Sequence, residues 1–422
     1  MISAKSEKRS SEAKALLYRA KTIFSHTVSV ARKGTPRKAG AGAYMTTMPH
    51  AALQYSGLIS ALSALSEGWG PHSPVHLYCF CHTPGCSSDH SCSTPATILE
   101  TLGCVVHTTL DGRDTALQPA THVLRSDSAV VVSTDYSHRN SPSCDESISA
   151  KDVILTDVRT ITRFSLQRVF FDARLSSRSK CLLPCGADLL LKLSPSPEES
   201  NWIIAGYWLS AWPQNTLLTR AGSAELSSEI VRGAVSYPIL RCIPLGKEGW
   251  YTALDYKLTA LQHLQHMWHY LSSGDGLSTP LWSPLKTLQG SAFVTVHRAG
   301  RVRACMGCWE DENESSNLAQ VVHIAAQRVL HTKWNDLPSL QKVKPTDTIS
   351  ITLIEPMDFW KYRTHCQRSF GCKVPNSTTF LPSVWEQFDS TETFEKALAA
   401  KALAPESALW HVYSAVEWEW KL

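Results

Sequence analysis

Residues 48–57 read MPHAALQYSG, from Met48 to Gly57, and this stretch decides how the first half of the chain is interpreted. It places the imidazole of His50 between a short apolar segment and a run of residues that is compatible with a helix. Neutral imidazole is the commonest protein ligand for transition metals, and a His at the end of a buried strand is held rigidly yet stays reachable. Because a single His in an apolar setting more often has a structural role, His50 needs partners elsewhere in the chain.

Candidate partners of His50 follow other strand-like segments. Residues 75–80 predict a short buried strand, and residues 129–133, rich in β-branched side chains, predict a central parallel strand. His82 follows the first of these strands, and Asp135 and His138 follow the second. Cys185 lies beside Gly186, before a later helix-like run. Each of these side chains can ligate a metal or move a proton. This repeated pattern of strand and loop is more specific than any one of its residues.

Five segments of the first half occur in the order of the motifs of a known family. They are MPHAALQYSG, the CFCHTPG segment, STPATILETLG, STDYSHRNSP and the LPCG segment. They resemble the PHAGYxYSG, GPNH, TPLG, SSDxSH and CG motifs of the Memo family, named from mediator of ErbB-driven cell motility. The resemblance implies a fold similar to the LigB-like class of extradiol dioxygenases, which use non-haem iron.

The resemblance also implies a metal site. Carried over motif by motif, it makes His50, His82 and Cys185 the ligands of an iron or copper ion. Asp135 and His138 would be the polar pair beside them, with Asp135 orienting an imidazole and His138 acting as acid or base. A thiolate and two imidazoles leave positions open for substrate or dioxygen.

The first half departs from the family in two places. Residues 111–125 contain nothing like the EHSxE segment of the family, and Cys81 stands before His82 where a small or amide residue is usual. The Memo-like part is therefore shortened. A clustered set of thiols and one imidazole also leaves a small zinc knuckle open as an alternative, although no paired CxxC spacing supports it: Cys79, Cys81, His82, Cys86 and Cys92.

Length and composition set the broad class. A chain of 422 residues and 46.7 kDa favours two domains, and an apolar content of 43% is enough for two cores. No segment approaches the ~18 apolar residues that span a bilayer, so we expect no membrane insertion. Thirteen Cys at uneven spacings argue against a disulfide framework and for a reducing compartment, the cytoplasm or the nucleus.

The net charge of +4 conceals an asymmetry. Residues 1–40 hold ten Lys and Arg against two Glu, a balance of +8, so the remaining 31 basic and 35 acidic groups balance at −4. Three interpretations of this basic segment stay open: an amphipathic helix of the first domain, a mitochondrial presequence, or an arm that binds a polyanion. Apolar residues within 11–30 come close to one helical face, which favours the helix.

The second half carries a different resemblance. Residues 250–271 predict a helix, and residues 290–296 predict a strand that turns at Ala299-Gly300 into a second strand at 301–307. The sequence GSAFVTVHRAGRVRACMGCWE looks like the GAFVTLxxxGxLRGCIGT core of the AMMECR family, and the match continues to the terminal WHVYSAVEWEW, over about residues 250–420. A Memo-like and an AMMECR-like domain in one chain is a known pairing, so each match supports the other.

The core motif supplies three candidate binding residues. Arg303 and Cys305 alternate along a predicted strand, so Arg303 is expected to point to a groove, while Gly307 allows a close backbone approach. In the family this segment is proposed as a functional surface. Cys305 has three interpretations: a packed strand residue, which we favour, a reactive nucleophile, or a metal ligand.

The expected fold is therefore α/β: a Memo-like domain with a mainly parallel sheet flanked by helices at residues 41–240, a linker at 241–249, and an α+β AMMECR-like domain at 250–422. Two functions remain. In the first, a metal-dependent redox site acts on a small molecule. In the second, the first domain is a scaffold and the groove around Arg303 binds a protein partner, or, less favoured, a nucleic acid.

Overall fold

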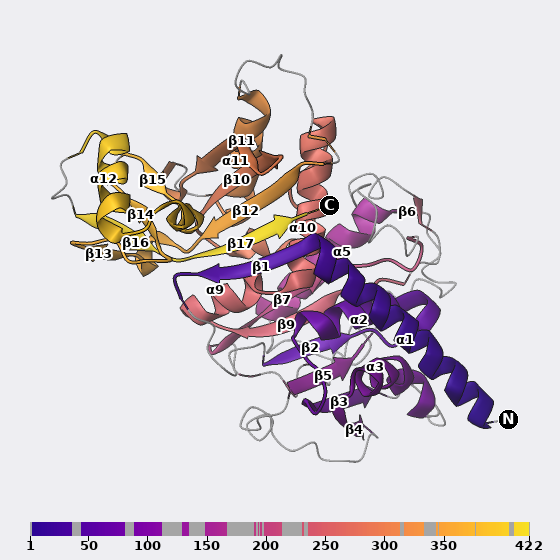
Figure 1. Cartoon of the computed structure of the whole chain (residues 1–422). Helices are drawn as coiled ribbons and strands as arrows, with labels where there is room; N and C mark the ends of the chain where they lie inside the picture. Colours follow the sequence, from indigo (N-terminus) through magenta and orange to yellow (C-terminus); the bar gives the residue numbers. More distant parts are fainter. Residues whose placement is uncertain are drawn as a thin grey trace. The chain divides into compact units, whose positions relative to one another are not determined.

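The computed structural model describes two compact units of mixed α/β structure (Figure 1). Unit 1 comprises Met1–His26, Gly42–Gln265 and Pro280–Pro284, and unit 2 comprises Thr27–Ala41, His266–Thr279 and Leu285–Leu422. No helix among the described residues is both long and apolar enough to cross a bilayer. The described residues are 2–35, 44–80, 88–111, 129–134, 148–166, 190, 193, 195, 198–212, 230–231, 235–312, 316–332, 343–344, 346–375, 377–404 and 409–421.

The main sheet of unit 1 has six strands in the order β4-β3-β5-β2-β9-β7 (Figure 1). Four of them run parallel to one another, while β9 is antiparallel to both β2 and β7. β3 and β5 coincide with the two strands expected at residues 75–80 and 129–133. The strands are β2 Met45–Met48, β3 Pro74–Phe80, β4 Val105–Asp111, β5 Ala129–Ser133, β7 Ser200–Gly206 and β9 Ile239–Pro244, with a small separate pair β6 Ile148–Ser149 and β8 Ile230–Val231.

Helices of unit 1 pack through apolar faces. The basic segment at the start of the chain forms α1, whose buried positions recur at helical spacing: Ala13, Leu17, Ala20, Ile23 and Phe24. α1 approaches α2 closely at Gly57, because a Cβ there would lie 2.6 Å from the Leu16 side chain. The helices are α1 Ile2–Thr27, α2 Leu53–Ser66, α3 Ser88–Leu102, α5 Ala150–Leu166, α9 Gly246–Leu254 and α10 Lys257–Ser273, of which the part from His266 onward belongs to unit 2.

Two sequence-based expectations about this part are wrong. Residues 241–249, expected as a linker, form the end of β9 and the start of α9. The helix expected at 250–271 is two helices, α9 and α10, separated at Tyr256. The break has a tertiary cause, since the Tyr256 side chain is buried and its hydroxyl lies 2.7 Å from the Ser63 hydroxyl on α2.

The larger sheet of unit 2 has five antiparallel strands in the order β1-β17-β12-β10-β11. One face of β10, β12 and β17 is apolar, and α11 packs on β10 and β11. The strands are β1 Val28–Lys33, β10 Ser291–Arg298, β11 Arg301–Cys308, β12 Thr348–Ile354 and β17 Ala415–Trp420, and α11 is Leu318–His331. β1 comes from the basic first segment, so residues 1–40 contribute a helix to unit 1 and a strand to unit 2.

A second sheet of unit 2, in the order β13-β16-β14-β15, packs with α12 around a small core. The strands are β13 Lys361–Arg363, β14 Gly371–Lys373, β15 Thr379–Phe380 and β16 Trp410–Tyr413, and α12 is Thr391–Ala402. Short 3-10 turns are η3 Pro284–Thr287, η4 Glu310–Glu312, η5 Met357–Phe359 and η6 Pro382–Gln387. In the core the rings of Trp385 and Phe394 stack at 3.7 Å between centroids.

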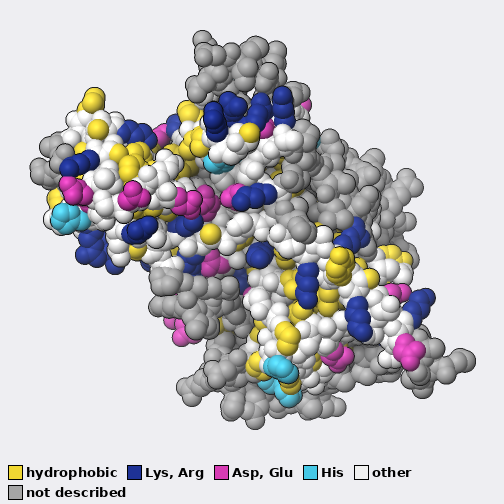
Figure 2. All heavy atoms as spheres, in the orientation of Figure 1, with side chains coloured by type: hydrophobic (Ala, Val, Ile, Leu, Met, Phe, Trp, Pro, Cys, Tyr) yellow, Lys and Arg dark blue, Asp and Glu magenta, His cyan; other side chains and the backbone are white. Residues whose placement is uncertain are grey.

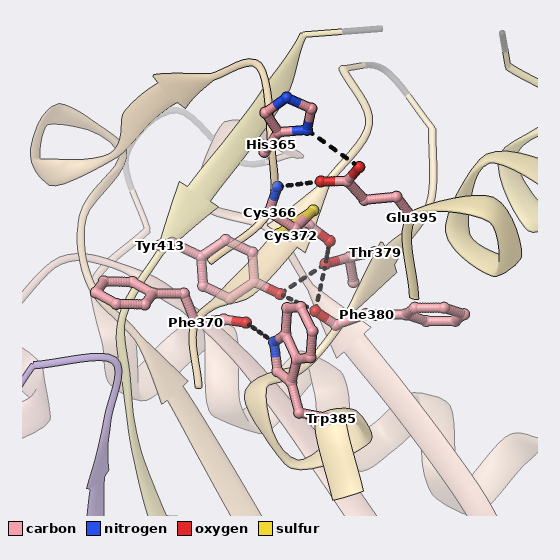
Figure 3. Close-up of a disulfide and its surroundings, with 9 residues drawn as sticks. All are labelled: His365, Cys366, Phe370, Cys372, Thr379, Phe380, Trp385, Glu395 and Tyr413. Atoms are coloured by element: carbon pink, nitrogen blue, oxygen red, sulfur yellow. Dashed lines mark hydrogen bonds and ion pairs between the residues drawn. A yellow bond between two sulfur atoms is a disulfide. The ribbon is translucent and has the colours of Figure 1, made fainter. Parts of the chain in front are cut away.

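Cysteine pairing differs from the expectation. The structure joins Cys366 to Cys372 within the small core of unit 2 (Figure 3), and Cys79 on β3 to Cys92 on α3 in unit 1. The odd number of cysteines and their uneven spacing gave no sign of these pairs, because each pair forms between positions that only the fold brings together. Since Cys79 and Cys92 are bonded to each other, they are not available as thiolate ligands of a zinc knuckle.

Candidate functional site

His50 follows β2 at the carboxyl edge of the parallel part of the unit 1 sheet. Its side chain is 5% exposed, and its Nδ1 atom lies 3.3 Å from the hydroxyl of Ser133, the last residue of the neighbouring parallel strand β5. A backbone bond of 2.9 Å from the Thr134 N–H to the Met48 carbonyl joins the two strand ends just before His50. Small-molecule sites in α/β proteins commonly form at this edge of a sheet.

A pocket of about 330 Å³ opens beside His50. Three helices of unit 1 contribute to its wall, together with the segment that joins β2 to α2. Its lining residues are Lys8, Arg9 and Glu12 of α1, His50, Ala52, Leu53 and Gln54 at the start of α2, and Ser93, Thr94 and Thr97 of α3.

The hydroxyls of the wall differ in their availability. Thr94 donates to the Ala51 carbonyl at 2.7 Å, and Thr97 donates to the Ser93 carbonyl one turn earlier at 2.5 Å. The Thr94 bond ties α3 to the segment after His50, the Thr97 bond lies within α3, and both hydroxyl protons are thus occupied. The pocket is therefore a built concavity with mixed polar and apolar walls, of a kind that suits a small molecule.

The other predicted ligands and catalytic residues, His82, Cys185, Asp135 and His138, lie outside the described residues. Within the described part of the chain, no three His, Cys, Asp or Glu side chains gather in a way that could hold a metal ion. Of the three metal ligands that the resemblance implies, His50 is the one that lies among the described residues.

In unit 2 the predicted motif lies on β11, which pairs with β10 alone among the described strands. Arg301, Val302 and Arg303 are exposed along this edge. Neither arginine has an ion-pair partner in the described part of the chain. Two neighbouring basic side chains on β10 and α11 are neutralised, because Arg298 pairs with Asp347 at 2.8 Å and Arg328 with Glu312 at 2.5 Å.

Cys305 follows Arg303 on β11, beyond a register shift that leaves Arg303 without a partner residue on β10. The residue is exposed, while its thiol accepts a hydrogen bond from the Thr295 hydroxyl at 3.2 Å across the β10–β11 pair. Burial raises the pKa of the Cys305 thiol and the charge of Glu417 raises it further, against the opposing effects of the Thr295 bond and of Lys401. The thiol is therefore protonated at neutral pH, which favours a packing or contact role over that of a nucleophile.

Gly307 lies under an aromatic ring. A Cβ at this position would overlap the side chain of Phe293, its cross-strand neighbour on β10, and that ring contacts Trp309 edge-on at 5.1 Å between centroids. The Gly307 carbonyl accepts a hydrogen bond of 2.5 Å from Arg328 of α11. The Phe293 ring, which belongs to the same sheet, therefore fills the space beside the Gly307 backbone.

Sequence reasoning missed the polar face on which Cys305 lies. Register places Thr295 of β10 beside Ser350 of β12 and Glu419 of β17, and all three share that face of the sheet. Glu417 lies on it too; burial raises the pKa of its carboxyl, Lys33 opposes this, and Glu419 and Glu386 add to it. Alternation of small polar with apolar residues along three strands is the sequence signal that marks such a face.

No family model matches the sequence. No curated protein matches it. Among solved structures, the chain is similar to the crystal structure of uncharacterized protein PH0010 from Pyrococcus horikoshii, with 17% sequence identity and a TM-score of 0.27. The match covers 37% of this chain and 87% of that chain. A likeness of this degree carries no argument about fold or function.

Proposed function

We propose that the protein is a Memo–AMMECR type fusion whose second unit is a binding module, and that β11 is its contact strand for an acidic, extended segment of a partner protein. The observation that supports this is the pair of arginines at an open sheet edge: Arg301 and Arg303 are exposed and without ion pairs among the described residues. An added strand would receive backbone hydrogen bonds from the edge, and its carboxylates would neutralise the arginines.

Charge around β11 supports an acidic partner. Lys and Arg side chains gather over the region of β10, β11 and α11 (Figure 2). Arg298 and Arg328 are paired within the unit, so the two arginines of β11 carry the local excess of positive charge. The protonated thiol of Cys305 adds a neutral contact surface beside them. Basic side chains of this kind speed encounter with an acidic partner and select against basic ones.

A photo-cross-linking experiment tests the proposal. The full chain carries a photoreactive amino acid at Val302, which is 54% exposed on β11, and is irradiated in its native cells. The matched control carries the same group at Tyr362, which is 68% exposed on β13. We expect one dominant protein adduct at position 302 that is absent at 362 and is lost in Arg303→Glu. Adducts that are the same at both positions, or that persist in Arg303→Glu, would refute the assignment.

A metal-dependent oxidoreductase is the second candidate function, favoured by the position of His50 in the wall of the pocket at the carboxyl edge of the sheet. His50, His82 and Cys185 would hold an iron or copper ion, and Asp135 and His138 would act beside it. Metal analysis of the purified chain tests this. Near-stoichiometric iron or copper that is lost in His50→Gln but retained in His107→Gln supports it, whereas a metal-free protein of normal thermal stability excludes it.

A further inference from the structure

The pocket beside His50 contains more positive charge than a neutral ligand needs. Lys8 and Arg9 of α1 line it, both are exposed, and neither forms an ion pair within the described part of the chain. Glu12, one turn further along α1, also lines it. Its volume of about 330 Å³ lies at the small end of the ~300 to 1,000 Å³ range of small-molecule sites, which suits a small metabolite.

The start of α2 adds backbone donors to the two cations. Ala52 caps this helix of 14 residues without any side-chain hydrogen bond, and Ala52, Leu53 and Gln54 line the pocket. The Tyr55 N–H already donates to the Ala52 carbonyl at 2.8 Å, and the helix dipole places partial positive charge at this end of α2. Ser93 contributes a hydroxyl from the facing wall, unlike Thr94, whose proton is already donated to the Ala51 carbonyl.

Packing of α1 holds the two cations over the pocket. The apolar face of α1 is buried, and its Leu16 side chain lies against Gly57, one turn into α2. Because Gly57 has no side chain, α1 and α2 approach closely. Lys8 and Arg9 lie about one turn before Ala13, a buried residue of α1, and so project from a helix and not from a loop.

We propose that this pocket binds the phosphate group of a small phosphate monoester. With Lys8, Arg9 and Glu12 in the lining, the formal charge of the pocket wall is +1, which favours an anion. A phosphate carries about −1.5 to −2 charge near neutral pH and has three strong acceptor oxygens, so it can engage Lys8, Arg9 and the start of α2 together, whereas a carboxylate has only two oxygens. The Arg9 fork and the first turn of α2 match the oxygens of the phosphate, and Glu12 accepts a hydroxyl of the organic part. The inference goes beyond the proposed function, because it involves neither β11 nor a metal ion.

Calorimetric titration of the full, metal-stripped chain tests the inference, with inorganic phosphate, glycerol 3-phosphate and acetate as probes. We expect both phosphates to bind, and acetate to bind at least ~10-fold more weakly, a difference of about 1.4 kcal/mol. The Lys8→Ala/Arg9→Ala variant should bind either phosphate at least ~10-fold more weakly than the wild type. Both side chains are exposed and unpaired, so the variant should keep its fold.

Lys14→Ala is the matched control, since Lys14 is an exposed cation of the same helix that does not line the pocket. It should bind phosphate as the wild type does, within about twofold. The inference is overturned if the wild type binds no phosphate, if acetate binds as tightly, or if Lys14→Ala loses as much affinity as the double variant. Each of these results leaves the cross-linking test on β11 unaffected, so the two proposals fail separately.

Discussion

At the scale of single residues, two glycines of unit 2 stand against aromatic rings that differ in their freedom to move. A Cβ on Gly371 would overlap the ring of Tyr413, which is fully buried and whose hydroxyl lies 2.6 Å from the Thr379 hydroxyl and donates to the Phe380 carbonyl at 3.2 Å (Figure 3). At Gly307 the facing ring, Phe293, is half-buried. Only the second ring has room to tilt.

We therefore expect Gly371→Ala to lower the free energy of unfolding by about 1 to 3 kcal/mol or more, as overpacked cores do, and Gly307→Ala to lower it by less. Urea denaturation of the two variants measures the difference. Equal losses would show that the hydrogen bonds of Tyr413 do not fix its ring.

Asp347 makes the stability of unit 2 depend on pH. Burial tends to raise the pKa of its carboxyl, but the hydrogen bonds from Arg298 and from the Lys344 backbone N–H, with the two positive charges, hold the pKa below its ordinary value. Because the pKa is depressed in the folded state, the carboxylate stabilises the fold above the unfolded value of about 3.9. This contribution is lost as pH falls through the lower, folded value.

The variant Asp347→Asn should then be less stable than the wild type by about 3 kcal/mol at pH 7, as for a broken buried ion pair. The difference in stability should shrink as pH falls below the unfolded value of about 3.9, and it should close below the depressed folded pKa, where the wild-type carboxyl takes up a proton. Chemical denaturation at several pH values gives this difference directly. A gap that stays constant down to pH 3 would contradict the role given to the charge of Asp347.

The sequence could predict some residues of the candidate sites but not their surroundings. His50 was predicted as a site residue because it follows a short apolar segment. The structure adds the nearby Ser133 hydroxyl and the pocket. Lys8 and Arg9 were seen as part of a basic segment, yet nothing local indicates that they line the same pocket as His50, about 40 residues further along the chain. That juxtaposition depends on the packing of α1, which is a tertiary contact.

At the scale of elements, the β10–β11 hairpin has an unusual turn. Ala299 and Gly300 both have positive φ, 50° and 73°, as a two-residue type I′ turn requires. Gly300 adopts this conformation freely, but the Cβ of Ala299 is strained there.

We expect Ala299→Asn to stabilise the protein by about 0.5 to 1 kcal/mol, since Asn tolerates this region. Thermal unfolding of the variant, with Val302→Asn as a control on the strand, tests this; a lowered melting temperature would count against the turn type.

Prediction of elements succeeded where local pattern and tertiary structure agree. The hairpin was predicted with strands at residues 290–296 and 301–307 and a turn at Ala299-Gly300, and it forms at Ser291–Arg298 and Arg301–Cys308. β1 was missed, because Val28–Lys33 is short and follows a helix with no Pro or Gly between them. Its identity as a strand comes from pairing with β17, almost 390 residues later in the chain.

At the scale of the whole molecule, the two units are built from alternating segments of the chain, whereas the sequence analysis predicted two domains that follow one another. Thr27–Ala41 and His266–Thr279 belong to unit 2, although most of the chain between them belongs to unit 1. The sequence gives a composition for each segment but not the partner against which it packs. For this reason, the helix at the start of the chain could be predicted while the strand that follows it could not be assigned to a sheet.

The two disulfides make a further prediction at this scale. They close loops with sequence separations of 13 and 6 residues, and loop-closure entropy assigns about 2 to 3 kcal/mol to each. Dithiothreitol should therefore lower the thermal stability of the full chain. Peptide mapping without reduction should recover Cys79 with Cys92 and Cys366 with Cys372. Recovery of all four as free thiols from freshly lysed cells would instead support the reducing compartment expected from composition.

The central claim is that unit 2 recognises an acidic partner through the arginines of β11. Its most direct measurement is the dissociation constant of the cross-linked partner for purified full chains carrying Arg301→Glu/Arg303→Glu or the control Lys361→Glu, which reverses an exposed charge on β13. We predict that the double reversal weakens binding at least ~10-fold, about 1.4 kcal/mol, while the control changes it by less than about twofold. Equal affinities for the two variants would contradict the claim.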